Sequence, residues 1–237
     1  MAHSVARFTE MLEQRQRQII WGVAAVVLVA AAIGGVWYWR VSVDNGARRL
    51  LADAMAVAEA PVVPATPPTA GQPAPPTPAA GSYPTERARL EAALKKFMAA
   101  AEAHPSSRHG LAARFEAAAA LAALGRTKEA EAQYQQVIDG AGKGLYADTA
   151  RLGLASVQAR AGQLDTAIAT FKQMADAKDG ALPQDGVLME LAKAYDQAGK
   201  RADAIKAYQR IVDEFPQSIY TSAARRELDL SKVTGAI

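Results

Sequence analysis

The feature that most constrains this chain is a repeat of 37 residues. An aromatic ring recurs at this interval, with an alanine four residues before it and a small or apolar residue three residues after it. The rings are Phe97, Tyr134, Phe171 and Tyr208; the alanines are Ala93, Ala130, Ala167 and Ala204; the third set is Ala100, Val137, Met174 and Ile211. Because the chain has only 5 Phe and 7 Tyr in 237 residues, this register indicates tandem copies of one structural unit.

Each copy has the pattern of a helical hairpin. Gly125, Gly162 and Gly199 lie five residues before the recurring alanine, where a left-handed glycine ends one helix and turns the chain back. Alanine, ring and apolar residue then share one face of the next helix. Ser107 and Ser218 are placed to N-cap the helices that follow them. The pattern predicts first helices over 111–124, 148–161 and 185–198, and second helices over 127–138, 164–175 and 202–213.

The hairpins resemble the tetratricopeptide repeat, and the last one fits its signature best. The matching residues are Leu188, Leu191, Ala192, Tyr195, Gly199, Ala204, Tyr208, Ile211 and Pro216. Two features depart from the pattern: Arg114 and Arg151 stand where a large apolar residue is usual, and the period is 37 rather than 34. The extra length lies between the hairpins.

The resemblance implies a solenoid whose first helices line a concave, protein-binding surface. By the same resemblance, the inward-facing, candidate partner-binding residues are Phe115, Ala119, Ala122, Leu152, Ser156, Ala159, Met189, Lys193 and Asp196. They predict a shallow and mostly apolar trough. The alternative is that several of these side chains pack between helices instead.

The beginning of the repeat region is interrupted. Residues 85–103 have the second-helix pattern, but the preceding segment, 61–84, holds nine of the twelve prolines and no charge. Proline fixes φ and removes a backbone donor, so 61–84 is expected to be an extended linker or an insert. The candidate partner helix is 44–60, and 218–233 is expected to cap the other end of the repeat domain, 85–237.

Residues 19–39 form an apolar stretch of 21 residues without a charge, long enough to cross a bilayer as a helix. The three tryptophans lie at its two ends, the aromatic-belt pattern of a membrane anchor. A buried core helix and a cleaved signal peptide are the alternatives. The preceding tail, residues 1–18, contains Glu10 and Glu13, which argues against a signal peptide. The numbers of flanking arginines are equal on the two sides, so charge alone does not orient the anchor.

Few residues suggest chemistry. The chain has no cysteine and a net charge of +3 without a basic stripe, which excludes thiol chemistry and gives no sign of nucleic-acid binding. His104 and His109 have no third ligand nearby in sequence, and the glycine-rich segment 140–144 follows a helix and lacks the ending of a phosphate loop. We therefore expect a protein-binding module, not an enzyme, with no catalytic residue, cofactor or metal.

The sequence as a whole predicts an all-α chain, with a single N-terminal transmembrane helix followed by a tetratricopeptide-like solenoid. This layout resembles the ancillary subunits of the SecYEG translocon (YfgM-like proteins), from which the proline insert is a departure. The resemblance implies a bacterial inner-membrane protein with residues 1–18 in the cytoplasm and 40–237 in the periplasm. It also implies a role in protein export, linking the translocon to periplasmic chaperones or clients. A cell-division coordinator with the same repeat type and a self-associating, homo-oligomeric scaffold remain the alternatives.

Overall fold

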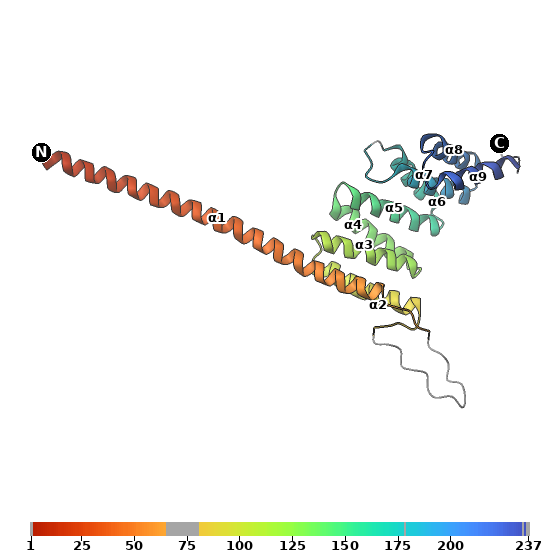
Figure 1. Ribbon diagram of the computed structural model, residues 1–237, viewed down its shortest axis with the longest axis horizontal. Coiled ribbons are helices and arrows are strands. Elements are labelled where there is room, and N and C mark those ends of the chain that lie inside the picture. Colours follow the sequence, from red (N-terminus) through yellow and green to blue (C-terminus); the bar gives the residue numbers. More distant parts are fainter. Residues whose placement is uncertain (1, 65–80, 178, 234, 236–237) are drawn as a thin grey trace, which may run out of the picture. The chain divides into compact units, whose positions relative to one another are not determined.

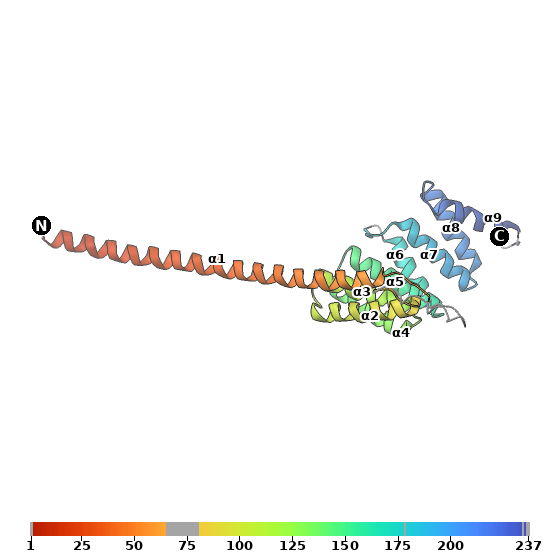
Figure 2. The same cartoon turned by 60° about the horizontal axis from the view of Figure 1, so that its bottom comes forward.

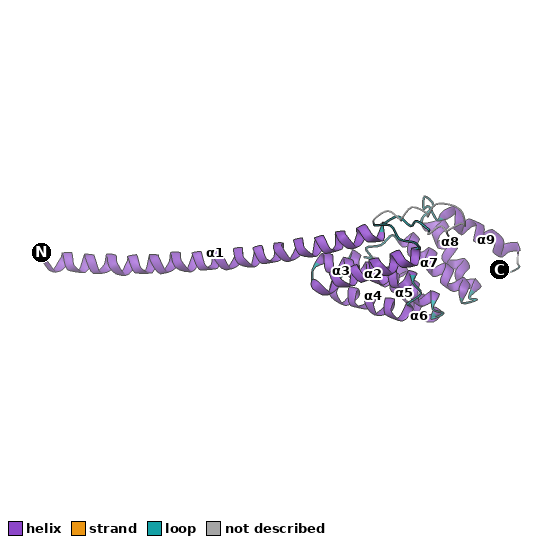
Figure 3. Cartoon of the chain, turned by 90° about the horizontal axis from the view of Figure 1, so that it is seen from below, coloured by secondary structure: helices purple, strands orange, loops and turns teal. Residues whose placement is uncertain are grey.

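The computed structural model describes residues 2–64, 81–177, 179–233 and 235, and the side chains of these residues except 2–20 and 39–41 (Figure 1). The chain divides into two compact units, Met1–Gly46 and Ala47–Ile237. Every regular element of the described residues is a helix (Figure 3). The helices are α1 Ala2–Ala58, α2 Glu86–Ala103, α3 Arg108–Ala123, α4 Thr127–Ala141, α5 Leu145–Arg160, α6 Leu164–Asp176, α7 Gln184–Gln197, α8 Arg201–Glu214 and α9 Thr221–Val233.

The N-terminal helix is longer than the sequence patterns suggest. We expected a tail over 1–18, a span over 19–39 and a separate helix over 44–60, whereas α1 is continuous from Ala2 to Ala58. The physical reason is the absence of a helix breaker, because the first proline of the chain is Pro61. Glycine inside a helix costs only about 1 kcal/mol relative to alanine and does not end it.

The middle of α1 exposes apolar side chains over residues 21–38. Trp21, Leu28 and Trp37 are 74%, 70% and 66% exposed. Of the described residues, one helix, Trp21–Ala58, is long and apolar enough to cross a membrane by length and composition. A continuous apolar surface of this kind is unfavourable in water and usually marks a membrane or protein contact.

In the second unit, hairpins α3/α4, α5/α6 and α7/α8 follow one another in chain order (Figure 2). The glycine turns are confirmed, since Gly125, Gly162 and Gly199 have φ of 76°, 81° and 70°. Each turn closes with the same two bonds. In the first turn, the N–H of Arg126 donates to the carbonyl of Leu121 at 2.9 Å, and that of Gly125 to a carbonyl three residues earlier at 3.2 Å. This pattern satisfies carbonyls that the end of a helix leaves free.

The 37-residue register is also the register of the core. The four recurring alanines are fully buried, and the four recurring rings are at most 5% exposed. The small alanine allows two helices to approach closely, and the ring fills the space beside it. On α3 and α4 the rings of Phe115 and Tyr134 meet edge to face, with centroids 5.5 Å apart. The repeat therefore persists because each copy packs the same residues against its neighbours.

The last part of α1 completes a first hairpin with α2. Leu51, Ala54 and Met55 belong to the same apolar cluster as Ala93 and Phe97. This contact lies within the second unit, which begins at Ala47. It supplies the first helix that the proline-rich sequence before α2 lacks.

The two ends of the proline-rich segment are joined by backbone hydrogen bonds. The N–H of Val63 donates to the carbonyl of Tyr83 at 2.9 Å, and the N–H of Tyr83 donates to the carbonyl of Pro61 at 3.0 Å. Residues 65–80, which hold most of the expected linker, lie outside the described residues. The segment is thus an insert between the two helices of the first hairpin.

One of the two expected helix caps is present. Ser107 caps α3, because its Oγ accepts the N–H of Gly110 at 2.9 Å. Ser218 does not cap α9, which begins only at Thr221. Its Oγ instead accepts the N–H of Tyr220 at 3.0 Å and donates to Asp185 Oδ2 at 2.6 Å. The serine therefore ties the turn before α9 to the first turn of α7.

Candidate protein-binding surface

The first helices of successive hairpins lie beside each other. Helix α3 contacts α5, and α5 contacts α7, across the intervening second helices. Such contacts place these three helices on the inner side of a solenoid, where repeat proteins present their binding surface.

A hollow of 270 Å³ lies between α3 and α5. Phe115 lines it from α3, where the edge-to-face contact with Tyr134 fixes the ring. Leu145 and Tyr146 line it from the beginning of α5, and Leu145 is 58% exposed. Most of this hollow is apolar, so it can take an apolar side chain of a partner.

Two charged residues border the same hollow. The guanidinium of Arg108 lies over the Tyr146 ring, 5.9 Å from its centroid, in cation–π geometry. Glu116 lies on the α3 side, and burial raises the pKa of its carboxyl above the ordinary value.

A second hollow, of 480 Å³, lies one repeat further along. It is lined by Leu152 of α5, by Leu182 before α7, and by Ile219 and Tyr220 before α9. Leu145, Leu182 and Ile219 are successive members of one 37-residue series, and Tyr146 and Tyr220 are two repeats apart. Leu152 and Leu182 stand 37 residues after Phe115 and Leu145, so the second hollow repeats the first. Ile219 and Tyr220 of the next connection extend it, and Ile219 is 86% exposed.

The residues predicted for the trough do not all lie on its surface. Phe115 and Leu152 line the two hollows, as stated above, and Lys193 is exposed and paired with Glu190 at 2.8 Å. Met189 is only 4% exposed and belongs to the apolar core, so its expected place in the trough is wrong. Four others are half-buried on α3 and α5, namely Ala119, Ala122, Ser156 and Ala159.

Asp196 is not offered to a partner either. Its carboxylate accepts hydrogen bonds from Tyr208 Oη at 2.9 Å and from Arg201 Nη1 at 2.6 Å. Arg201 also donates to the carbonyl of Glu227 at 3.3 Å, so this network joins α7, α8 and α9. Burial, followed by the hydrogen bond to Asp196, raises the pKa of Tyr208 well above its usual value. The role of Asp196 is structural.

The residues that sequence reasoning missed stand at the beginnings of the first helices. Leu145, Leu182 and Ile219 keep the 37-residue spacing, and this signal was present in the sequence. The hairpin signature of glycine, alanine and ring does not include these positions and so does not point to them. Among the described residues, no group of three or more His, Asp or Glu side chains could hold a metal ion.

Comparison with known proteins identifies the family. A family model described as a tetratricopeptide repeat-like domain matches residues 14–230. The chain belongs to this tetratricopeptide repeat-like family. Two crystal structures of the kinesin light chain "nearly identical TPR-like repeats" from Podosopora anserina share the fold, each with a TM-score of 0.53 and 20% identity. Each match covers 62% of this chain and 80% of that chain. A search of curated proteins found no match.

Membership of this family indicates a class of function, the binding of other proteins. Tetratricopeptide-like repeats are protein-interaction scaffolds rather than catalytic folds. The chain is therefore suited to binding protein partners. Among the described residues, the two equivalent hollows form a candidate surface for such binding.

Proposed function

We propose that this protein is a membrane-anchored tetratricopeptide-repeat adaptor of the bacterial cell envelope. Residues 19–39 span the inner membrane, residues 1–18 lie in the cytoplasm, and the repeats lie in the periplasm. There the adaptor assists protein export, holding clients or chaperones near the SecYEG translocon. The observation that carries the proposal is the combination of an exposed apolar helix with a repeated hollow on the first-helix face.

The apolar part of α1 supports the anchor. Its exposed side chains between Trp21 and Trp37 form a surface that a bilayer would cover. Helix α1 continues from this stretch to Ala58 without a break, so a single helix connects the apolar part to the first hairpin. The orientation and the export role rest on the likeness in layout to the translocon subunits.

The repeated hollows support the binding of a polypeptide. Equivalent hollows one repeat apart suit a ligand that is itself a chain, with side chains entering one after another. An isolated small ligand would need one enclosed pocket rather than a row of open ones.

Thiol labelling tests the topology. We expect Ser82→Cys to react with an impermeant thiol reagent on intact spheroplasts and Ser4→Cys to react only after lysis. The native chain has no cysteine, so every signal comes from the introduced residue. Labelling of Ser4→Cys instead of Ser82→Cys on intact spheroplasts would refute the proposed location.

Site-specific crosslinking tests the adaptor role. A photocrosslinker at Leu145 or Ile219, both exposed, should capture translocon components, chaperones or exported polypeptides in native membranes. The same group at Lys96, on α2, is the matched control and should capture none of them. Crosslinks only to further copies of this chain would favour the self-associating scaffold, as would a concentration-dependent increase in particle size.

A further inference from the structure

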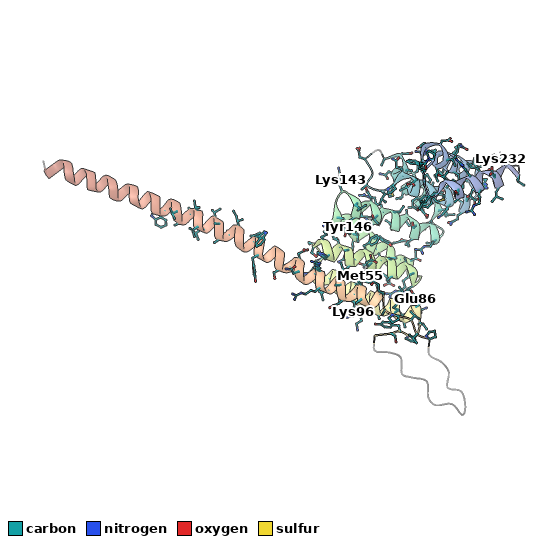
Figure 4. All side chains as sticks on the ribbon, viewed as in Figure 1. Met55, Glu86, Lys96, Lys143, Tyr146 and Lys232 are labelled. Atoms are coloured by element: carbon teal, nitrogen blue, oxygen red, sulfur yellow. The ribbon has the colours of Figure 1, made fainter. Side chains whose placement is uncertain are left out.

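A third hollow, of 380 Å³, adjoins the one between α3 and α5. It shares Arg108, Leu145 and Tyr146 with that hollow and adds Lys143 from the connection between α4 and α5. Lys143 and Tyr146 lie at the same edge of the repeats (Figure 4). We call the new one the outer hollow and the hollow that contains Phe115 the inner hollow.

The two hollows differ in charge. Two cations, Arg108 and Lys143, line the outer hollow, and no acidic residue lines it. Within the described part of the chain, neither cation forms an ion pair with a carboxylate, whereas several cations from α7 to α9 do. The outer hollow therefore offers positive charge that the fold itself does not neutralise.

Local structure places both cations at the outer hollow. The contact with the Tyr146 ring restricts Arg108, so less side-chain entropy is lost when it binds an anion. Lys143 stands between Gly142 and Gly144, whose φ of 68° and 111° bend the connection sharply. The bend carries Lys143 to the edge of the hollow that Arg108 lines.

The inner hollow complements the outer one. Its lining from Ala112, Phe115 and Leu145 is apolar, and its single carboxyl belongs to Glu116, which burial disfavours in the charged form. An apolar side chain fits here, and an anion fits beside it. The same arrangement is not repeated in the hollow at Leu152, where the lining contains Asp185 and no cation.

The geometry points to an extended peptide that carries an apolar side chain next to a carboxylate as the ligand of these two hollows. The apolar side chain enters the inner hollow, and the carboxylate lies between Arg108 and Lys143. A further apolar side chain of the same peptide reaches the equivalent hollow at Leu152. This inference rests on the proposed binding of polypeptides and adds to it the chemistry that selects them. Anionic lipid is the rival ligand for a basic and apolar surface, but a lipid headgroup gives no reason for a second hollow one repeat away.

Fluorescence anisotropy of full-length protein in uncharged detergent tests the inference. The probes are labelled Gly/Ser peptides that carry one central pair: Leu-Glu, Leu-Gln, Ser-Glu or Leu-Lys. We expect the Leu-Glu peptide to bind about tenfold more tightly than the peptides that lack either feature. In the double variant Arg108→Glu with Lys143→Glu, the affinity for the Leu-Glu peptide should fall about tenfold or more, and the affinity for the Leu-Lys peptide should rise. Both positions are exposed, so the variant should keep its helicity.

The control is Lys95→Glu with Lys96→Glu, the same charge change at exposed positions of α2, which should leave every affinity unchanged. Equal binding of Leu-Glu and Leu-Gln, unmoved by charge reversal, would overturn the inference and leave the adaptor role standing. Absence of any binding of the Leu-Glu peptide would overturn it as well, while crosslinking at Ile219 decides the adaptor role separately. If phosphatidylglycerol vesicles bind through Arg108 and Lys143 and no peptide preference exists, the hollows are a lipid site and the inference is wrong.

Discussion

Gly153 is a helical glycine that the packing of the repeats requires. A Cβ at this position would lie 2.7 Å from Cε1 and Cζ of Tyr134, closer than real contacts allow. The tyrosine cannot move away easily, because it is buried and Phe115 packs against its ring. Alanine in place of glycine gains about 1 kcal/mol of helix propensity, while overpacking of a core costs about 1–3 kcal/mol. We expect Gly153→Ala to lower the free energy of unfolding by about 1–2 kcal/mol. The cost of overpacking should outweigh the gain in helix propensity, because the obstacle is a rigid ring.

The matched control is Gly186→Ala in α7. There the nearest atom to a new Cβ is Tyr220 Cε2 at 3.6 Å, an ordinary contact. With no clash to oppose the gain in helix propensity, this variant should be stabilised by about 0.5–1 kcal/mol. The two Gly→Ala substitutions are thus expected to change the free energy of unfolding in opposite directions.

A double-mutant cycle isolates the contact, with urea unfolding of the full chain in mild detergent followed by far-UV circular dichroism. In a Tyr134→Ala background, Gly153→Ala should become neutral or stabilising, a coupling of about 2 kcal/mol. Equal effects of Gly153→Ala in the two backgrounds, or a gain like that at Gly186, would refute the packing of Tyr134 on α5.

Three further predictions concern the repeat. Phe171→Ala should cost about 3–5 kcal/mol in urea melts because it leaves a cavity in the core, whereas Tyr83→Ala in the insert should cost almost nothing. Gly162→Ala should cost about 1 kcal/mol, since its φ of 81° disfavours a Cβ. Because burial and Asp196 raise the pKa of Tyr208, its phenol stabilises the fold fully below the unfolded-state pKa of about 10, and this stability is lost as pH rises further. Urea midpoints should therefore fall above that pH more steeply for wild type than for Tyr208→Phe.

The hairpins were predictable from the sequence because one physical unit is repeated. A left-handed glycine ends each first helix, so the observed ends at Ala123, Arg160 and Gln197 lie within one residue of those expected. The ring and alanine positions followed from the same spacing, since a core that must be packed four times permits little variation. The continuity of α1 and the role of Ser218 were not predicted. A helix that passes from one environment into another needs no breaker in its sequence, and a serine before a helix can bond to a neighbouring helix instead of capping its own.

The trough was harder to predict, because a position on a helix face does not decide which neighbour covers it. Leu152 and Met189 occupy equivalent positions, yet Leu152 lines a hollow and Met189 is buried. Asp196 likewise faces inward by register, but Arg201 and Tyr208 engage its carboxylate. Those partners come from the packing of α8 and α9 against α7, so the spacing of residues within α7 does not predict them.

The edge of the candidate surface lies at the connections between hairpins. The turns within hairpins are uniform, three residues between the two helices, as at 124–126 and 161–163. The connections between hairpins are less uniform: residues 177–183 precede α7 and 215–220 precede α9, where Leu182 and Ile219 stand, whereas only 142–144 precede α5, where Lys143 stands. Leu182 and Tyr220 of these connections pack against the core, whereas the side chain of Ile219 remains exposed. The edge of the hollows is thus built largely from the connections between hairpins, which vary in length more than the turns within hairpins do, and loops of this kind can acquire a binding surface while the helices keep their core.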